Sequence, residues 1–208
     1  MIERMNPMSI TANNLVYKRR SVRFFKSNPI SKVDMREILR AGMWAPSAKN
    51  RQPWKFIVVK GQSKEEMLDL MEKGIERSEQ GEGVLAGTKE LYVNARFTLK
   101  CMREAPIAVM VVNPKGRSLM DHWTPAEKIH ELSDVQAIGA AAENMALQAT
   151  AMGIGSLWIG NIFFAYDELK QWIGEPGEMV LAMSFGYPNH NPCPLARKDE
   201  AEVIEVRD

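Results

Sequence analysis

Residues 133–161 read SDVQAIGAAAENMALQATAMGIGSLWIGN, and this stretch decides the fold. Its apolar side chains recur in alternating steps of three and four residues, the period of an α-helix, at Val135, Ile138, Ala142, Met145, Ala149 and Met152. Ser133 is predicted to cap the helix and to form a capping box with Gln136. Gly153 is predicted to end it in the left-handed conformation. The pattern therefore predicts a helix of roughly 20 residues, about 30 Å long.

This predicted helix carries almost no charge. Between Val135 and Tyr166 the only formally charged side chain is Glu143, so the helix is either central to the fold or at an oligomer interface. Close approach of another backbone is allowed by three small residues, Gly139, Ala140 and Ala141. Residues 154–161 predict a short strand with glycines at both ends, as found where a ligand or a second backbone comes close. A buried helix and strand with no ligand is the alternative interpretation.

The composition is that of an ordinary globular protein. The chain has 208 residues, of which 45% are hydrophobic and 25% charged, and a single domain over residues 1–208 is expected. Its net charge of +1 predicts neither a nucleic-acid nor a membrane partner. The helix is not expected to span a membrane because four polar side chains interrupt it, Gln136, Glu143, Asn144 and Gln148.

The cysteines and the N-terminal residues indicate the compartment. Cys101 and Cys193 form no CxxC pair, so neither a disulfide framework nor a structural zinc site is expected. Residues 1–10 lack the apolar core of a signal peptide. We therefore expect a cytoplasmic protein.

A basic run at residues 18–25, KRRSVRFF, is the first candidate site. Several guanidinium groups together with a hydroxyl group are suited to binding a dianionic phosphate. A solvated basic turn is the alternative interpretation. The second candidate is the polar loop at residues 46–54, PSAKNRQPW, which leads into an apolar strand predicted at residues 55–59. Such a loop can present fixed hydrogen-bond partners to a heteroaromatic ring, and an ordinary helix-to-strand connection is equally consistent with it.

Further helices and strands are predicted around these motifs. Capping motifs predict helix starts at Ser31, for a helix running to about residue 43, and at Ser63. The other helices are expected at residues 10–18 and 164–173, and the other strands at 107–112, 179–185 and 203–206. Residues 77–90 are predicted to form a surface loop, and residues 117–132 show no clear period.

Four motifs, in this order, resemble those of the nitroreductase family of FMN-dependent oxidoreductases: residues 19–23 (RRSVR), 45–54 (APSAKNRQPW), 153–161 (GIGSLWIGN) and 185–188 (FGYP). The resemblance covers nearly the whole chain. It implies an α+β fold of three layers, α/β/α, in which helices flank a central mixed, largely antiparallel sheet. It also implies a homodimer with FMN at the subunit interface and a C-terminal arm exchanged between subunits. The extended, proline-containing tail, which we expect to add a strand to a sheet edge, points the same way.

The resemblance also implies which residues bind FMN. The first phosphate and ribityl contacts would come from Arg19, Arg20, Ser21 and Arg23. The other subunit would contribute, toward the ribityl chain and the ring, Pro46, Ser47, Ala48 and Asn50. The ring near N5 and O4 would face the backbone of Ile159, Gly160 and Asn161. The phosphate would also meet the basic group of the tail, Arg197 with Lys198.

The activity implied by the resemblance is ping-pong hydride transfer. NADH or NADPH would reduce FMN at N5, and a small aromatic or conjugated acceptor, such as a nitroarene or a quinone, would then take the hydride. Two alternatives stay open: another FMN reaction of the superfamily, such as dehalogenation or ene reduction, and a non-catalytic flavin-binding or sensing dimer. No catalytic side chain is predicted, because the flavin carries the chemistry.

Two features leave the substrate open. Many nitroreductases carry an acidic residue where this chain has Gly160, whereas others carry glycine. Residues 117–132 correspond to a variable region that helps cover the substrate site, so His122, Trp123 and His130 are candidates for substrate contacts; lone surface histidines are the alternative. No metal is expected, because the histidines show no metal-ligand spacing.

Overall fold

The structure, a computed structural model, describes residues 15–118 and 120–207. Within these residues, four strands form one sheet in the order β1-β2-β4-β3, and all three pairings are antiparallel. The strands are β1 (Lys55–Lys60), β2 (Ile107–Asn113), β3 (Gly155–Ile159) and β4 (Glu178–Gly186). A parallel element is added by an isolated bridge between Ser21 and Ser156.

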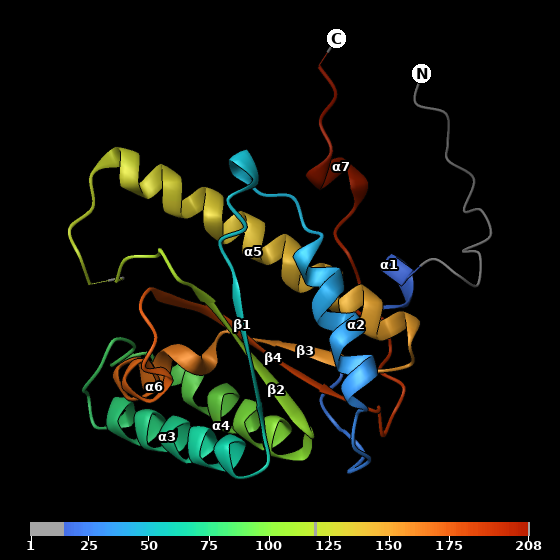
Figure 1. Cartoon of the computed structure of the whole chain (residues 1–208), viewed down its shortest axis with the longest axis horizontal. Coiled ribbons are helices and arrows are strands. Elements are labelled where there is room, and N and C mark those ends of the chain that lie inside the picture. Colours follow the sequence, from blue (N-terminus) through green and yellow to red (C-terminus); the bar gives the residue numbers. More distant parts are fainter. Residues whose placement is uncertain (1–14, 119, 208) are drawn as a thin grey trace.

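Helices cover both faces of this sheet (Figure 1). One face carries α2 (Lys32–Met43) and α5 (Pro125–Ala151). The other carries α3 (Gln62–Glu79), α4 (Lys89–Glu104) and α6 (Tyr166–Ile173). The short helical segments are α1 (Leu15–Lys18), η1 (Ala48–Asn50), η2 (Asn161–Ala165) and α7 (Glu200–Val203). The predicted three-layer α+β fold is therefore confirmed.

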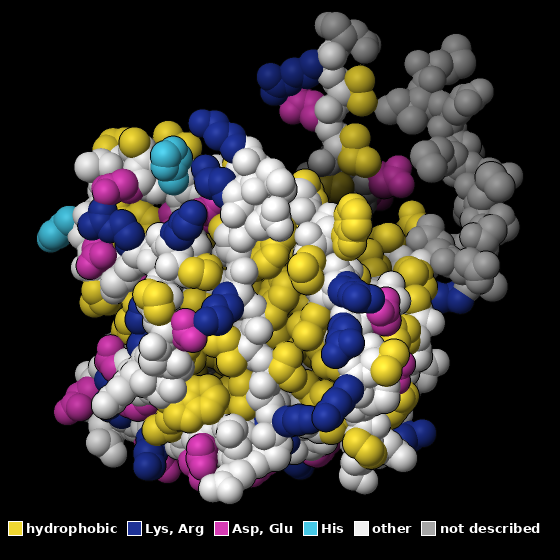
Figure 2. Space-filling model, viewed as in Figure 1, with side chains coloured by type: hydrophobic (Ala, Val, Ile, Leu, Met, Phe, Trp, Pro, Cys, Tyr) yellow, Lys and Arg dark blue, Asp and Glu magenta, His cyan; other side chains and the backbone are white. Residues whose placement is uncertain are grey.

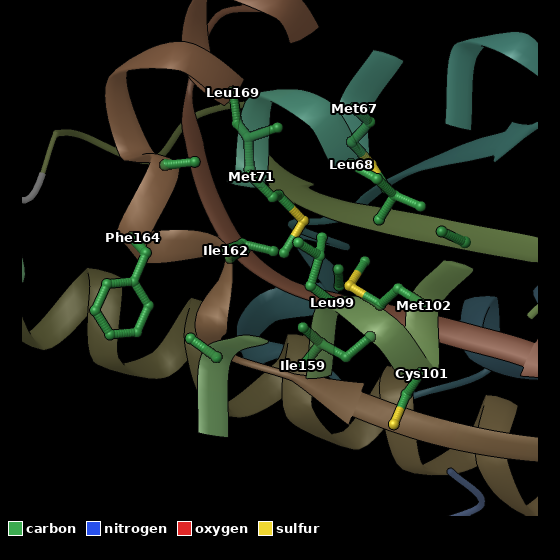
Figure 3. Close-up of a cluster of buried hydrophobic side chains, with 14 of the residues drawn as sticks. Met67, Leu68, Met71, Leu99, Cys101, Met102, Ile159, Ile162, Phe164 and Leu169 are labelled. Carbon is green, nitrogen blue, oxygen red and sulfur yellow. The ribbon is translucent and has the colours of Figure 1, made fainter. Parts of the chain in front are cut away.

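The sheet separates two hydrophobic clusters. Every residue of β2 is buried, and because side chains alternate along a strand, Val109 and Val111 face the α2/α5 cluster whereas Ala108 and Met110 face the α3/α4 cluster. Figure 3 shows part of the second cluster, in which methionines and leucines of α3 and α4 meet Ile159 from the end of β3. By contrast, β1 is an edge strand with exposed residues. The position of the predicted strand is therefore confirmed, but the prediction that this strand is buried is wrong.

The long helix α5 begins earlier than predicted. Its N-cap is Thr124, whose side chain accepts from the Glu127 amide while the Glu127 side chain accepts from the Thr124 amide. Ser133 lies inside the helix and donates to the Ile129 carbonyl oxygen at 2.8 Å. The first two turns are mostly exposed, so no apolar period marks them. The predicted end is confirmed, because Gly153 follows the helix with φ +71°.

Of the other local predictions, some are confirmed and some are wrong. Ser31 caps α2, its side chain accepting from the Asp34 amide at 3.0 Å, as predicted. Ser63 is not a cap, because α3 begins at Gln62 after Gly61. A helix starts at Lys89, inside the predicted loop 77–90, and α3 occupies that loop's first residues. The strand predicted at 203–206 is wrong: α7 ends at Val203, and no strand follows it within the described tail.

The N-terminal helix is described only in part. Most of the helix predicted at residues 10–18 lies outside the described residues, and α1 forms its last turn. Among the described residues, no helix combines the length and the apolar character needed to cross a membrane.

A buried lysine joins α3 to α4. Lys64 is 5% exposed, and its Nζ donates at 2.7–3.3 Å to three carbonyl oxygens at the C-terminal end of α4, those of Met102, Arg103 and Ala105. We expect Lys64→Met to lower the free energy of unfolding by ~1–3 kcal/mol, because these carbonyls lose a charged donor. Urea denaturation measures the change. Lys73→Met, on an exposed position of α3, should change stability by less than ~0.5 kcal/mol, and equal values for both variants would contradict this role.

Candidate functional site

The N-terminal basic run and the C-terminal tail meet at a cavity of about 120 Å³. The basic run lines it with Arg19, Arg20, Ser21 and Arg23, and the tail lines it with Pro192, Cys193, Pro194, Leu195 and Arg197. No described residue of the lining is acidic. Four guanidinium groups and a hydroxyl group around one cavity are a donor set suited to a phosphate group. Lys198 is exposed and does not line the cavity.

The basic run is held in place by the sheet and by α5. The Val22 amide donates to the Ser156 carbonyl oxygen at 2.9 Å, which places the run beside the start of β3. Arg19 Nε lies 2.9 Å from Oε1 of Glu143, the isolated charge in the middle of α5. Arg20 Nη1 donates to the Tyr17 carbonyl oxygen at 2.6 Å. These contacts hold the backbone at Val22 and the side chains of Arg19 and Arg20 beside the cavity.

The glycines at the two ends of β3, Gly155 as its first residue and Gly160 just after its last, have different surroundings. A Cβ atom on Gly155 would lie 2.7–2.9 Å from the buried side chain of Val22, so the close approach predicted from the sequence is that of the basic run itself. A Cβ atom on Gly160 would meet nothing within 4 Å. The start of β3 is therefore packed against the basic run, and its end is open.

This difference predicts different effects for two alanine substitutions. Gly155→Ala should cost ~1–3 kcal/mol of stability, because the stiff Val22 side chain must move and displace the arginines beside it. Gly160→Ala should change stability by less than ~0.5 kcal/mol. Thermal unfolding of the two variants tests this pair, and a larger loss for Gly160→Ala would contradict the packing described.

The residues on either side of Gly160, at the end of β3, are held in place by packing and by a hydrogen bond. Ile159 and Ile162 are buried in the α3/α4 cluster, as Figure 3 shows, so the predicted role of Ile159 toward a ligand rests on its backbone. Asn161 Nδ2 donates to Thr98 Oγ1 of α4 at 3.0 Å, which occupies its side chain. Gly160 lies between them with an exposed backbone at φ −93°. A flat ring can approach this position without meeting a side chain of Gly160.

The predicted ring and phosphate segments lie at opposite ends of β3. Ser21 faces Ser156 near the first residue of the strand, and Gly160 follows the last. A strand rises ~3.3 Å per residue, so Ser156 and Gly160 are separated by roughly 13 Å along it. An extended ligand with an anionic group at one end and a ring at the other matches this arrangement.

The loop at residues 46–53 does not line the arginine cavity. Its backbone is strained, because Lys49, Asn50 and Gln52 all have φ between +48° and +54°. Non-glycine residues in this conformation cost energy and cluster at functional sites. The Ser47 hydroxyl oxygen accepts from the Gln52 amide at 3.0 Å, and Asn50 Oδ1 accepts from the Gln52 side chain at 3.2 Å.

An ion pair that the sequence analysis did not predict holds this loop. Arg51 Nε and Nη2 both donate to Asp134 Oδ1, at 3.0 and 2.6 Å, and so tie the loop to α5. Arg51 stands in the quoted loop motif, but its partner is 83 residues away, so no local pattern pairs them. The histidine candidates show no cluster: within the described residues, no three His, Cys, Asp or Glu side chains are placed to hold a metal ion.

Comparison with known proteins assigns this arrangement to a family. A relative from Archaeoglobus fulgidus, named "Putative NADH dehydrogenase/NAD(P)H nitroreductase", is 32% identical over 203 residues, 93% of this chain and 90% of the relative. An iodotyrosine deiodinase from Thermotoga neapolitana is 27% identical, over 91% of this chain and 95% of its own length. A solved structure from Desulfovibrio desulfuricans, in complex with FMN, has a TM-score of 0.68 at 25% identity, covering 93% of this chain and 95% of that one.

The family model describes most of the chain. It is the model of the nitroreductase family, and it matches residues 16–187, which include the basic run, the strained loop and all four strands. Together with the three-layer fold, this match shows that the chain belongs to the nitroreductase family.

Proposed function

We propose that this protein is an FMN-dependent oxidoreductase. The observation that carries the proposal is the cavity in which Arg19, Arg20, Arg23 and Arg197 converge beside β3. At the other end of that strand, the open backbone at Gly160 provides a surface that a ring can approach. The nitroreductase family and the FMN complex from Desulfovibrio desulfuricans support FMN as the ligand that joins these two places.

In this proposal the residues of the chain bind and orient the cofactor. The guanidinium groups and the Ser21 hydroxyl would hold the phosphate, and the backbone of residues 159–161 would face the ring. When bound, FMN would accept hydride from NADH or NADPH at N5 and pass it to a nitroaromatic, quinone or related conjugated acceptor. A Cβ atom on Gly160 would meet nothing within 4 Å, and this open position would let donor and acceptor approach the ring in turn.

Rapid mixing without oxygen tests the redox function. Adding NADH or NADPH to the flavin-loaded protein should bleach the flavin absorbance, and adding a quinone or nitroarene should restore it. Initial rates should give parallel double-reciprocal lines, the pattern of a ping-pong mechanism. A flavin that neither donor bleaches would contradict the proposed activity. It would leave a flavin-binding or sensing protein as the better interpretation.

Dehalogenation is a second candidate, and the Thermotoga neapolitana deiodinase favours it. The two functions differ in their product. With the flavin reduced beforehand, a dehalogenase releases halide from a halogenated aromatic substrate, whereas a quinone or nitro reductase does not. Halide release during single turnover therefore separates the two.

We also propose that the protein is a homodimer with a site made by both subunits. The family resemblance assigns the loop at residues 46–53 to the flavin of the other subunit, and no residue of this loop lines the arginine cavity of its own chain. Large apolar side chains are exposed on α1, α2 and the segment after it; Trp44 alone is 87% exposed. The tail extends away from the body in Figure 1 and exposes Leu195, Val203, Ile204 and Val206. In Figure 2 hydrophobic side chains gather over the middle of the same view, where a partner could cover them.

A further inference from the structure

A second cavity, of about 380 Å³, lies beside the strained loop. Its walls come from that loop, from the turn after β2, from Trp123 and from the N-terminal half of α5. The volume is in the range of sites that bind small molecules. Figure 2 shows basic and histidine side chains gathered at the end of the molecule where Figure 1 places this half of α5.

Among the arginines and lysines that line this cavity, the arginines form ion pairs with described residues and the lysines do not. Arg51 is bound to Asp134, and Arg117 is bound to Glu127 and lies 3.5 Å from Asp121. The ammonium groups of two other lining residues, Lys49 and Lys115, have no ion-pair or hydrogen-bond partner among the described residues. Two cations without partners at one cavity are suited to an anionic ligand.

Glu131 is the remaining carboxyl group of the lining. Burial raises its pKa, and the negative charges of Asp134 and Glu178 raise it further, although Asn113 Nδ2 donates to it at 3.3 Å and opposes the shift. Arg51 and Arg117 are bound to carboxylates, so Lys49 and Lys115 are the lysine and arginine side chains of this lining whose charge no described carboxylate pairs.

An aromatic side chain forms another wall. Trp123 is half-buried, and its Nε1 donates to the Ser118 carbonyl oxygen at 3.0 Å, which fixes the plane of the indole. The same indole lines an adjoining cavity of about 400 Å³, together with the apolar Leu132 and Val135 and the charged Asp121, Lys128 and Glu131. A fixed indole provides a stacking surface for an aromatic ring.

We propose that this cavity binds a small aromatic molecule with an anionic substituent, its anionic group held by Lys49 and Lys115 and its ring by Trp123. The inference rests on the proposed function in one respect: because residues 46–50 would face the partner's flavin, the bound molecule would be the electron acceptor. The binding itself depends only on the residues of this cavity.

Equilibrium binding to the purified full-length protein tests the proposal, with 4-nitrobenzoate and the neutral 4-nitrobenzamide as probes of matched size. Titration calorimetry should show roughly tenfold or tighter binding of the benzoate, the effect expected of a charge-assisted contact. The double variant Lys49→Gln/Lys115→Gln should remove this preference and leave the amide unchanged. Trp123→Ala should weaken both probes. The matched control Lys60→Gln/Lys73→Gln changes two exposed lysines outside the lining and should alter neither.

The outcomes test the binding site and the proposed redox function separately. Equal affinities for the two probes, or a benzoate preference that survives in the double lysine variant, would overturn the proposal. Reduction is then measured on the same pair of acceptors. If the benzoate binds through the lysines but the protein reduces neither acceptor, the proposed function fails and the binding site stands. If both acceptors are reduced with no lysine-dependent preference in binding, the function stands and this inference fails.

Discussion

Gly139→Arg is expected to give a monomer that retains no FMN. Gly139 lies on α5 at a place where an added Cβ atom meets nothing within 4 Å, next to the half-exposed Ala140. In the proposed homodimer this small-residue face of α5 meets the partner, so a buried guanidinium group without a partner would cost several kcal/mol and separate the subunits. Without the partner's loop, the ring would lose half of its site.

Light scattering with size-exclusion chromatography measures the mass, and absorbance near the flavin band measures retention. Ser63→Arg, on an exposed position of α3, is the matched control and should stay dimeric and yellow. Ala141, which the sequence grouped with Gly139, cannot be used in this test. Its side chain is fully buried inside this chain, so arginine there would disrupt the fold itself. A Gly139→Arg protein that stays dimeric with FMN bound would place the subunit interface elsewhere.

Arg197→Ala should raise the dissociation constant for FMN by ~10- to 150-fold, the loss expected when a charge-assisted contact to phosphate is removed. Arg197 is the guanidinium group that the tail brings to the arginine cavity, and it has no carboxylate partner among the described residues. The substitution is on an exposed segment, so the fold should be unaffected.

The neighbouring residue supplies the control for this variant. The family resemblance assigns both Arg197 and Lys198 to the phosphate, but only Arg197 lines the cavity. Lys198→Ala should therefore change the dissociation constant less than twofold, roughly the limit expected of a screened surface charge. Fluorescence titration of flavin-free protein measures both. Equal effects of the two variants would mean that the tail acts through its overall charge and not through the placement of Arg197.

The sequence predicts most of the fold, because its strongest signals are local. The apolar period of α5, the Ser31 cap and the left-handed Gly153 all depend on residues within a few positions of one another. The start of α5 is predicted wrongly because its first turns extend into solvent and carry no apolar period. Thr124 with Glu127 marks that start, and the sequence contains this capping box.

The candidate site is predictable in its chemistry but not in its contacts. The arginines and serine of residues 19–23 indicate an anion site, and the structure brings them to one cavity with Arg197. The pairs that position the site, Arg19 with Glu143 and Arg51 with Asp134, join residues more than eighty positions apart. A single sequence contains no pattern that reveals such pairs. The tail is misjudged for a related reason: its predicted strand requires a partner edge, and the chain by itself forms the short helix α7.

The visible absorbance spectrum of the purified protein, followed by denaturation and identification of any released flavin, tests the central claim most directly. Bound FMN in an amount equimolar with the chain is the predicted result. It would show that the protein holds the cofactor for which the arginine cavity and the open end of β3 are the proposed site. A colourless protein that also fails to take up added FMN would contradict the account and return residues 19–23 to a solvated basic turn.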